Sequence, residues 1–172
     1  MAITLSQKEK MLLQDQKNHE QICIQKYQTY ANQTQNAQLK QLFTNFAQAE
    51  QQHLNTINQI LSGQVPNVQQ GQQQQGQQQG QQNQQQNQQS GTQAAGAAGS
   101  TGAQASNSQS DSSLLSDMLM TEKYVSGTYD TAIFEFADPS IRQVLNHIQK
   151  EEQEHGEGLF KFMQSHGMYN VQ

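Results

Sequence analysis

Residues 139–165 read PSIRQVLNHIQKEEQEHGEGLFKFMQS. Apolar side chains recur along this stretch at the spacing of one helix face, except at a gap that Glu152 and His155 fill. Asp138 followed by Pro139 is typical of an N-cap and the first residue of a helix. The stretch therefore predicts a long helix that carries a glutamate and a histidine on its buried face.

The same pattern occurs 102 residues earlier, where Glu50 and His53 fill the gap. A single glutamate stands 30 residues before each Glu-x-x-His pair, at Glu20 and at Glu122. Two single glutamates and two Glu-x-x-His pairs are the ligand set of four-helix bundles that hold two metal ions. This spacing is the main functional signal of the chain.

Residues 12–61 align with 114–163 without a gap, and ten of the 50 aligned positions are identical. One Glu-x-x-His carries little weight, so the in-register pair matters more than either copy. The alignment indicates two copies of one helical hairpin. The identical pairs are Leu12/Leu114, Leu13/Leu115, Asp15/Asp117, Glu20/Glu122, Tyr27/Tyr129, Thr29/Thr131, Gln41/Gln143, Glu50/Glu152, Gln51/Gln153 and His53/His155.

We expect an all-α, ferritin-like antiparallel four-helix bundle made of two repeated hairpins joined by a long crossover. Asn36 aligns with Asp138 and can cap the second helix, and Gly63 can end it. The predicted helices cover 6–34, 37–62, 112–136 and 139–165.

The segment between the hairpins has a different composition. No Asp, Glu, Lys or Arg occurs between Glu50 and Asp111, and Gln, Gly, Ser, Ala and Asn dominate residues 64–110. Such a segment buries too little apolar surface to offset the entropy of ordering, so we expect disorder. The predicted organisation is a first hairpin at 1–63, a Gln/Gly/Ser-rich linker at 64–111 and a second hairpin at 112–172.

Charge and composition exclude several classes. The net charge of −5 divides into +1 over residues 1–63 and −6 over 111–172, without a basic stripe, which argues against nucleic acid as a partner. No apolar run is long enough for a membrane span, and no signal peptide opens the chain, so we expect synthesis in the cytosol. The single cysteine, Cys23, excludes an intramolecular disulfide framework.

Glutamates inside an apolar stripe are costly unless they are paired or bind metal. Two divalent ions would neutralise four carboxylates, and carboxylate with imidazole suits iron or manganese and, in third place, zinc. By the usual pattern Glu50 and Glu152 would bridge the ions, Glu20 and Glu122 would be terminal, and His53 and His155 would bind one ion each. Catalytic residues beyond these ligands cannot be named from the sequence.

Tyr27 and Tyr129 each follow a single glutamate by seven residues, which is two helical turns. A phenol in that place can donate to a ligand carboxylate from a second layer, although tyrosines in such places are more often plain core residues.

Further interpretations compete with metal binding. The glutamates and histidines could form a polar network without metal, or could point to solvent at the end of the bundle. Cys23 aligns with Val125, which favours core packing over ligation. Two further groups are expected on the surface. They are Glu151, Glu154 and Glu157, as a solvated face, and His19, His147 and His166, which have no repeated partner.

Four stretches of the second half resemble the coat F family of spore coat proteins from endospore-forming bacteria. They are Ser126-Gly127-Thr128-Tyr129-Asp130, Ala137-Asp138-Pro139-Ser140-Ile141-Arg142, Glu151-Glu152-Gln153-Glu154-His155 and Ser165-His166-Gly167-Met168-Tyr169. The resemblance covers roughly 112–171, and residues 1–63 look like a diverged copy. It implies a ferritin-like helical protein that is deposited in the spore coat during sporulation.

Three functions follow as hypotheses. The first is a structural coat component, with other coat proteins or itself as partners, in which the Gln-rich segment makes weak multivalent contacts. The second is a di-manganese or di-iron oxidoreductase that acts on peroxide or oxygen, with catalase-like or ferroxidase-like chemistry. Metal storage ranks third, because nothing indicates a hollow shell. The long linker allows a closed single chain, a homo-oligomer or a dimer that exchanges hairpins.

Overall fold

A computed structural model describes residues 3–66 and 101–169, with side chains described from residue 110 onward in the second range. These residues form four helices and no strand. The helices are α1 (Gln7–Gln33), α2 (Ala37–Leu61), α4 (Thr101–Glu135) and α5 (Pro139–Ser165).

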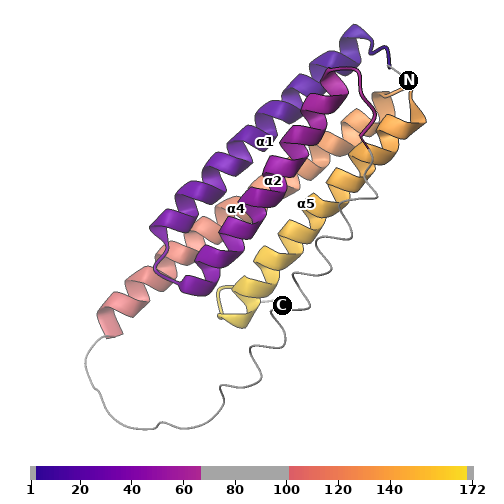
Figure 1. The fold of residues 1–172 in the computed structure, drawn as a ribbon. Helices are drawn as coiled ribbons and strands as arrows, with labels where there is room; N and C mark the ends of the chain where they lie inside the picture. Colours follow the sequence, from indigo (N-terminus) through magenta and orange to yellow (C-terminus); the bar gives the residue numbers. More distant parts are fainter. Residues whose placement is uncertain (1–2, 67–100, 170–172) are drawn as a thin grey trace, which may run out of the picture.

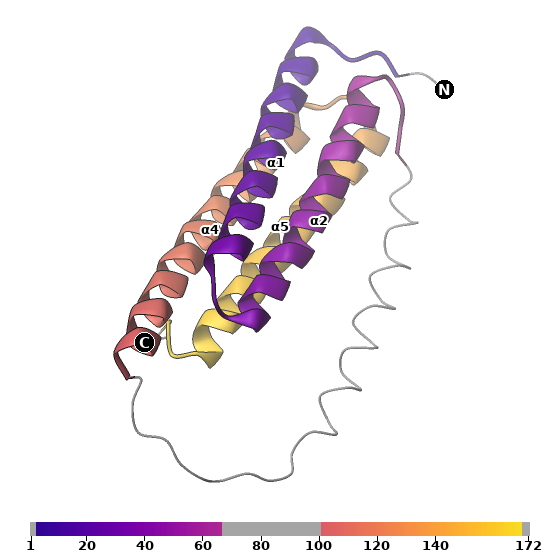
Figure 2. The same ribbon diagram turned by 60° about the vertical axis from the view of Figure 1, so that its left-hand side comes forward.

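The helices pack as two antiparallel hairpins, α1 with α2 and α4 with α5 (Figure 1). The hairpins face each other so that α1 lies beside α4 and α2 lies beside α5, as the turned view also shows (Figure 2). Helix α2 ends and helix α4 begins at opposite ends of the bundle. The two hairpins are therefore joined from one end of the bundle to the other, which confirms the predicted all-α bundle with a crossover between hairpins.

Three of the helix starts have side-chain caps that the sequence pattern contains. Ser6 and Glu9 form a capping box at the start of α1. The Asn36 side chain accepts from two backbone N–H groups at the start of α2, and Asp138 does the same for α5, with Pro139 following. Gly63 follows the end of α2 with a φ of 86°, a conformation that favours glycine.

Helix α4 starts earlier than predicted. It begins at Thr101 rather than at 112, so its first turns lie inside the stretch predicted as linker, and Asp111 is buried. The sequence prediction relied on the lack of charge in this stretch. Residues 103–110, however, contain neither proline nor glycine, so a helix anchored downstream can extend through them. The rest of the predicted linker lies outside the described residues, apart from 64–66.

The apolar core is divided into two clusters. One lies at the end that holds the α4–α5 turn and includes Leu13, Ile57, Val125 and Leu145, and the other lies at the opposite end. The second cluster includes Phe43, Met118, Leu159 and further residues of all four helices. In α2, α4 and α5 the predicted ligands fall in sequence between the members of the two clusters. The bundle thus has a polar centre between two apolar clusters.

Candidate metal centre

All six predicted ligands come together in this polar centre. Helices α1 and α4 contribute one glutamate each, and helices α2 and α5 contribute one Glu-x-x-His pair each. Their exposed fractions range from 0% to 5%, so the interpretation in which they point to solvent at the bundle end is wrong. The residues are Glu20, Glu50, His53, Glu122, Glu152 and His155.

Their ligand atoms form two overlapping sets. Within each set, one atom from every residue lies within 4.8 Å of the atoms from the others. Glu50 and Glu152 belong to both sets, in the place predicted for two bridging carboxylates. The sets are Glu20, Glu50, His53 and Glu152, and Glu50, Glu122, Glu152 and His155.

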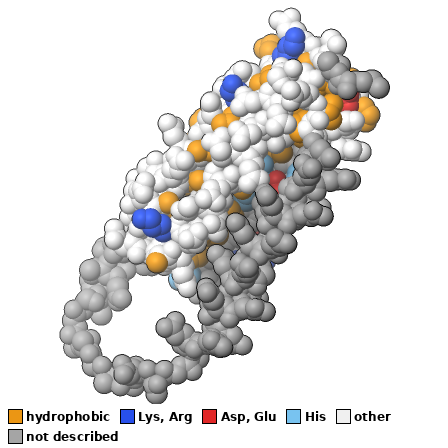
Figure 3. Space-filling model, viewed as in Figure 1, with side chains coloured by type: hydrophobic (Ala, Val, Ile, Leu, Met, Phe, Trp, Pro, Cys, Tyr) orange, Lys and Arg blue, Asp and Glu red, His pale blue; other side chains and the backbone are white. Residues whose placement is uncertain are grey.

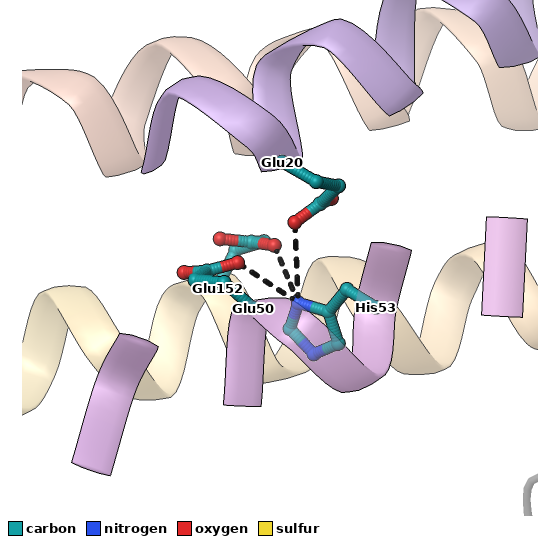
Figure 4. Close-up of side chains that lie close together, drawn as sticks. All are labelled: Glu20, Glu50, His53 and Glu152. Carbon is teal, nitrogen blue, oxygen red and sulfur yellow. Dashed lines mark hydrogen bonds and ion pairs between the residues drawn. The ribbon is translucent and has the colours of Figure 1, made fainter. Parts of the chain in front are cut away.

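Figure 4 shows three carboxylates of the first set turned toward one ring nitrogen of His53. Nδ1 of His53 lies 3.0 Å from Glu152 Oε1, 3.1 Å from Glu50 Oε2 and 3.6 Å from Glu20 Oε2. One N–H can point at only one of these oxygens. A cation in place of that proton could contact all three.

Four carboxylate oxygens of the centre are buried and have no hydrogen bond of their own among the described residues, although Oε1 of Glu152 shares Nδ1 of His53 with Glu50. They are Oε2 of Glu20, Oε2 of Glu122 and both oxygens of Glu152. An unsatisfied buried acceptor costs about 1–3 kcal/mol, and more when it is charged. Such groups are rare in folded proteins, so four in one place favour a bound species that satisfies them.

The acidities of the carboxyls reflect this environment. Burial raises the pKa of Glu20 to about 8 against the opposing effect of His53. Burial, together with the neighbouring Glu50 and Glu20 carboxylates, raises the pKa of Glu152 to about 8. The pKa of Glu122 is raised well above its ordinary value by burial and by the charges of Glu152 and Glu50. Without metal these three groups favour the protonated form at neutral pH.

Glu50 and His53 shift in the opposite sense. Burial would raise the pKa of Glu50, but its contacts with His155 and His53 outweigh burial and hold the pKa below its usual range. Burial would lower the pKa of His53, but hydrogen bonds to surrounding glutamates, Glu151 first, raise it well above its ordinary value. The centre therefore keeps an imidazolium–carboxylate pair that divalent ions could replace with release of protons.

Tyr27 and Tyr129 are fully buried, and both phenols donate hydrogen bonds to carboxylates of the centre. The partners are exchanged between hairpins, because Tyr27 donates to Glu122 and Tyr129 donates to Glu20. Burial, followed by the charge of the partner glutamate, raises the pKa of each phenol well above 10. Each tyrosine thus packs in the core and also donates to a predicted ligand.

Two residues expected on the surface lie at the edge of the centre. The Glu151 side chain is only 17% exposed, and its Oε2 lies 2.9 Å from Nε2 of His53. His147 is 19% exposed, and its Nε2 lies 3.6 Å from the same oxygen. The repeat could not reveal them, because their counterparts are Ala49 and Asn45. The sequence did contain one signal, because a spacing of four residues places His147 and Glu151 on one helix face.

Cys23 and the remaining acidic and histidine side chains lie outside the two ligand sets. Cys23 is fully buried in an apolar cluster, as its alignment with Val125 predicted. Glu154 and Glu157 are half-exposed and pair with lysines of α5, and His166 is exposed. His19 is partly buried, with its ring packed edge-on against Tyr124.

Comparison with known proteins gives a family match for the second hairpin. The family model of the Coat F domain matches residues 110–172. The protein described as uncharacterized protein YusN of Bacillus subtilis (strain 168) is 31% identical over 67 residues, which are 39% of this chain and 61% of that protein. The chain therefore spans about three fifths of the length of this relative.

No solved structure matches the chain. Among the described residues, the helices include none with the length and apolar character that a membrane crossing requires. The family match covers the stretch in which the sequence resembled coat F proteins, and it confirms that resemblance. Residues 110–172 therefore resemble the Coat F domain.

Proposed function

We propose that this protein is a spore-coat component whose four-helix bundle holds two divalent metal ions. The Coat F domain at residues 110–172 supports the location. The metal centre is supported by the two overlapping sets of buried ligand atoms that share Glu50 and Glu152. The second observation carries the proposal, because these buried carboxylates converge on few donors, and one Nδ1 of His53 faces Glu20, Glu50 and Glu152 together.

The donor set fits iron or manganese best. Four carboxylates balance the charge of two divalent ions, and one imidazole for each ion adds a nitrogen ligand. In this assignment Glu50 and Glu152 would be shared by the two ions, and Glu20 and Glu122 would each hold one ion. The phenols of Tyr27 and Tyr129 then orient the two terminal carboxylates. When bound, iron or manganese would supply Lewis-acid or one-electron chemistry, and the bundle would keep bulk water from the centre.

The test is the metal content of the full chain, purified without chelator from cells supplied with iron and manganese. About two ions per chain are expected from the two ligand sets. Glu152→Ala should lose most of the metal, whereas Glu154→Ala, two residues away and half-exposed, should keep it. Absence of stoichiometric metal from a folded wild-type protein, or equal loss in both variants, would contradict the proposal.

The location is tested separately. A fluorescent fusion of the chain, followed in sporulating cells, should gather in the coat around the developing spore. A fusion that stays diffuse in the mother cell would contradict the coat assignment and leave the metal centre unaffected. Oxygen or peroxide consumption by the metal-loaded protein then decides between an inert and a redox-active centre.

A further inference from the structure

The repeat predicts two equivalent metal positions, but the residues around the two histidines are not equivalent. Position 151 holds a glutamate, whereas its counterpart in the first hairpin is Ala49, which is buried. Position 147 holds a histidine, whereas its counterpart is the exposed Asn45. The second hairpin therefore adds a carboxylate and an imidazole that the first hairpin does not offer in return.

Glu151 contacts His53 directly, and His147 contacts Glu151. Nδ1 of His53 faces Glu50, Glu152 and Glu20 inside the centre (Figure 4). Its Nε2 lies 2.9 Å from Oε2 of Glu151. Glu151 in turn lies 3.6 Å from His147. Acidic and histidine side chains are visible at the surface near mid-length of the bundle (Figure 3). One ring nitrogen of His53 is thus held by a carboxylate while the other faces the ligand set.

His155 has different neighbours. Its Nδ1 lies 2.9 Å from Glu50 Oε1 and 3.9 Å from Glu152 Oε2. Its ring packs against the ring of Phe46, with 4.5 Å between the ring centroids. No carboxylate among the described residues pairs with its Nε2, since Ala49 stands where a second Glu151 would be.

A carboxylate that accepts the Nε2 proton of a histidine fixes the tautomer, so that the lone pair of Nδ1 faces the metal. It also orients the ring and makes the ligand nitrogen more basic. Loss of such a partner commonly weakens metal binding by about 10–100-fold. Of the two histidines in the ligand sets, His53 alone has this support within the described part of the chain.

We propose that the two metal positions are unequal, and that the first divalent ion binds at the position formed by Glu20, His53 and the shared glutamates. Glu151 is the positioning residue that makes the difference. This inference rests on the proposed dinuclear centre and adds an order of filling to it. It also requires that Glu151 act through His53 rather than through its charge alone.

The experiment is a calorimetric titration of the metal-free full chain with Mn²⁺ at pH 7, with free Mn²⁺ counted by electron paramagnetic resonance. The wild-type protein should bind two ions in two steps, the first at least about tenfold tighter. Glu151→Ala should weaken the tighter step by about 10–100-fold and change the other step less than about twofold. Glu151→Gln, which keeps an acceptor oxygen, should lose less affinity than Glu151→Ala.

Glu154→Ala is the matched control, because it removes the same charge from the exposed side of the same helix. Two further backgrounds isolate each position. With Glu122→Gln, the remaining ion should still depend on Glu151. With Glu20→Gln, the remaining ion should not respond to Glu151→Ala. Thermal unfolding of each metal-free variant checks that it folds. If a buried glutamine prevents folding, the comparison of Glu151→Ala with the wild-type protein remains the test.

Two failures can be told apart. A folded wild-type protein that binds no Mn²⁺ would overturn the dinuclear centre itself. Two ions bound with equal affinity, or a Glu151→Ala variant that weakens both steps alike or behaves like Glu154→Ala, would overturn only the inequality.

Discussion

Glu50 and His53 in the first hairpin occupy the same places in the repeat as Glu152 and His155 in the second, yet their surroundings differ. The first hairpin presents an aromatic ring, Phe46, to the histidine of the other hairpin. The second hairpin presents a carboxylate instead. The ligand places are thus fixed by the repeat, whereas the residues one layer out have diverged. This comparison indicates which substitutions should act alike in the two hairpins and which should not.

The largest expected effect is one that the hairpins share, namely a fall in the stability of the metal-free protein as pH rises from 5 to 8. Glu20 from the first hairpin and Glu152 from the second have pKa values near 8 in the folded state, against 4.5 ordinarily. Between these values the folded state holds protons that the unfolded state releases, so stability falls with rising pH. His53, with a raised pKa, acts in the same direction above pH 6.5.

The expected loss is on the order of a few kcal/mol, which should lower the unfolding temperature by about 5 °C or more. Glu50 does not oppose it, since a lowered pKa gives stability that is already complete above pH 5. Thermal unfolding followed by circular dichroism measures the trend. Added Mn²⁺ should abolish it, and Glu20→Gln should reduce it. A metal-free protein that becomes more stable from pH 5 to 8 would contradict the assigned shifts.

The next effect concerns the two tyrosines, each of which donates to a glutamate of the other hairpin. Tyr27→Phe should weaken metal binding at the Glu122 position by about tenfold, because Tyr27 donates to Glu122. Tyr129→Phe should weaken the Glu20 position by a similar factor. Mn²⁺ titration in the Glu122→Gln background identifies the position, since Tyr27→Phe should have no further effect there. An effect of Tyr27→Phe on the Glu20 position would show that each tyrosine serves its own hairpin.

The smallest effect concerns glycines of the second hairpin. A Cβ at Gly158 would lie 2.7 Å from Phe46 of the first hairpin, whereas a Cβ at Gly127 would meet nothing within 4 Å. We expect Gly158→Ala to destabilise the fold by about 1–2 kcal/mol through displacement of the ring. Gly127→Ala should stabilise it by up to about 1 kcal/mol, because alanine is the better helix former. Chemical denaturation of both variants checks the opposite signs, and equal signs would contradict this account of the packing.

Much of the architecture follows from local signals in the sequence. The caps at Asn36 and Asp138 and the positions of apolar residues predict α1, α2 and α5 to within one residue at each end. The start of α4 could not be predicted in this way, because the stretch before Asp111 has neither charge nor a marked apolar stripe. The first turns of α4 continue a helix whose later residues pack in the bundle.

The candidate centre shows a similar division. Spacing within one helix places Glu50 beside His53 and Glu152 beside His155. Because the repeat aligns these pairs and the two single glutamates, the six candidate ligands could be named from the sequence. The exchange of tyrosine partners depends on how the hairpins pack, which no local pattern encodes. The contact of Glu151 with His53 was not predicted, because a repeat indicates only the residues that its two copies share.

The most direct test of the dinuclear centre is a crystal structure of the chain loaded with Mn²⁺, with anomalous diffraction used to locate the ions. Two anomalous peaks are expected in the polar centre, both in contact with Glu50 and Glu152, with Glu20 and His53 on one and Glu122 and His155 on the other. Crystals of folded, Mn²⁺-soaked protein without a peak among these six side chains would contradict the account.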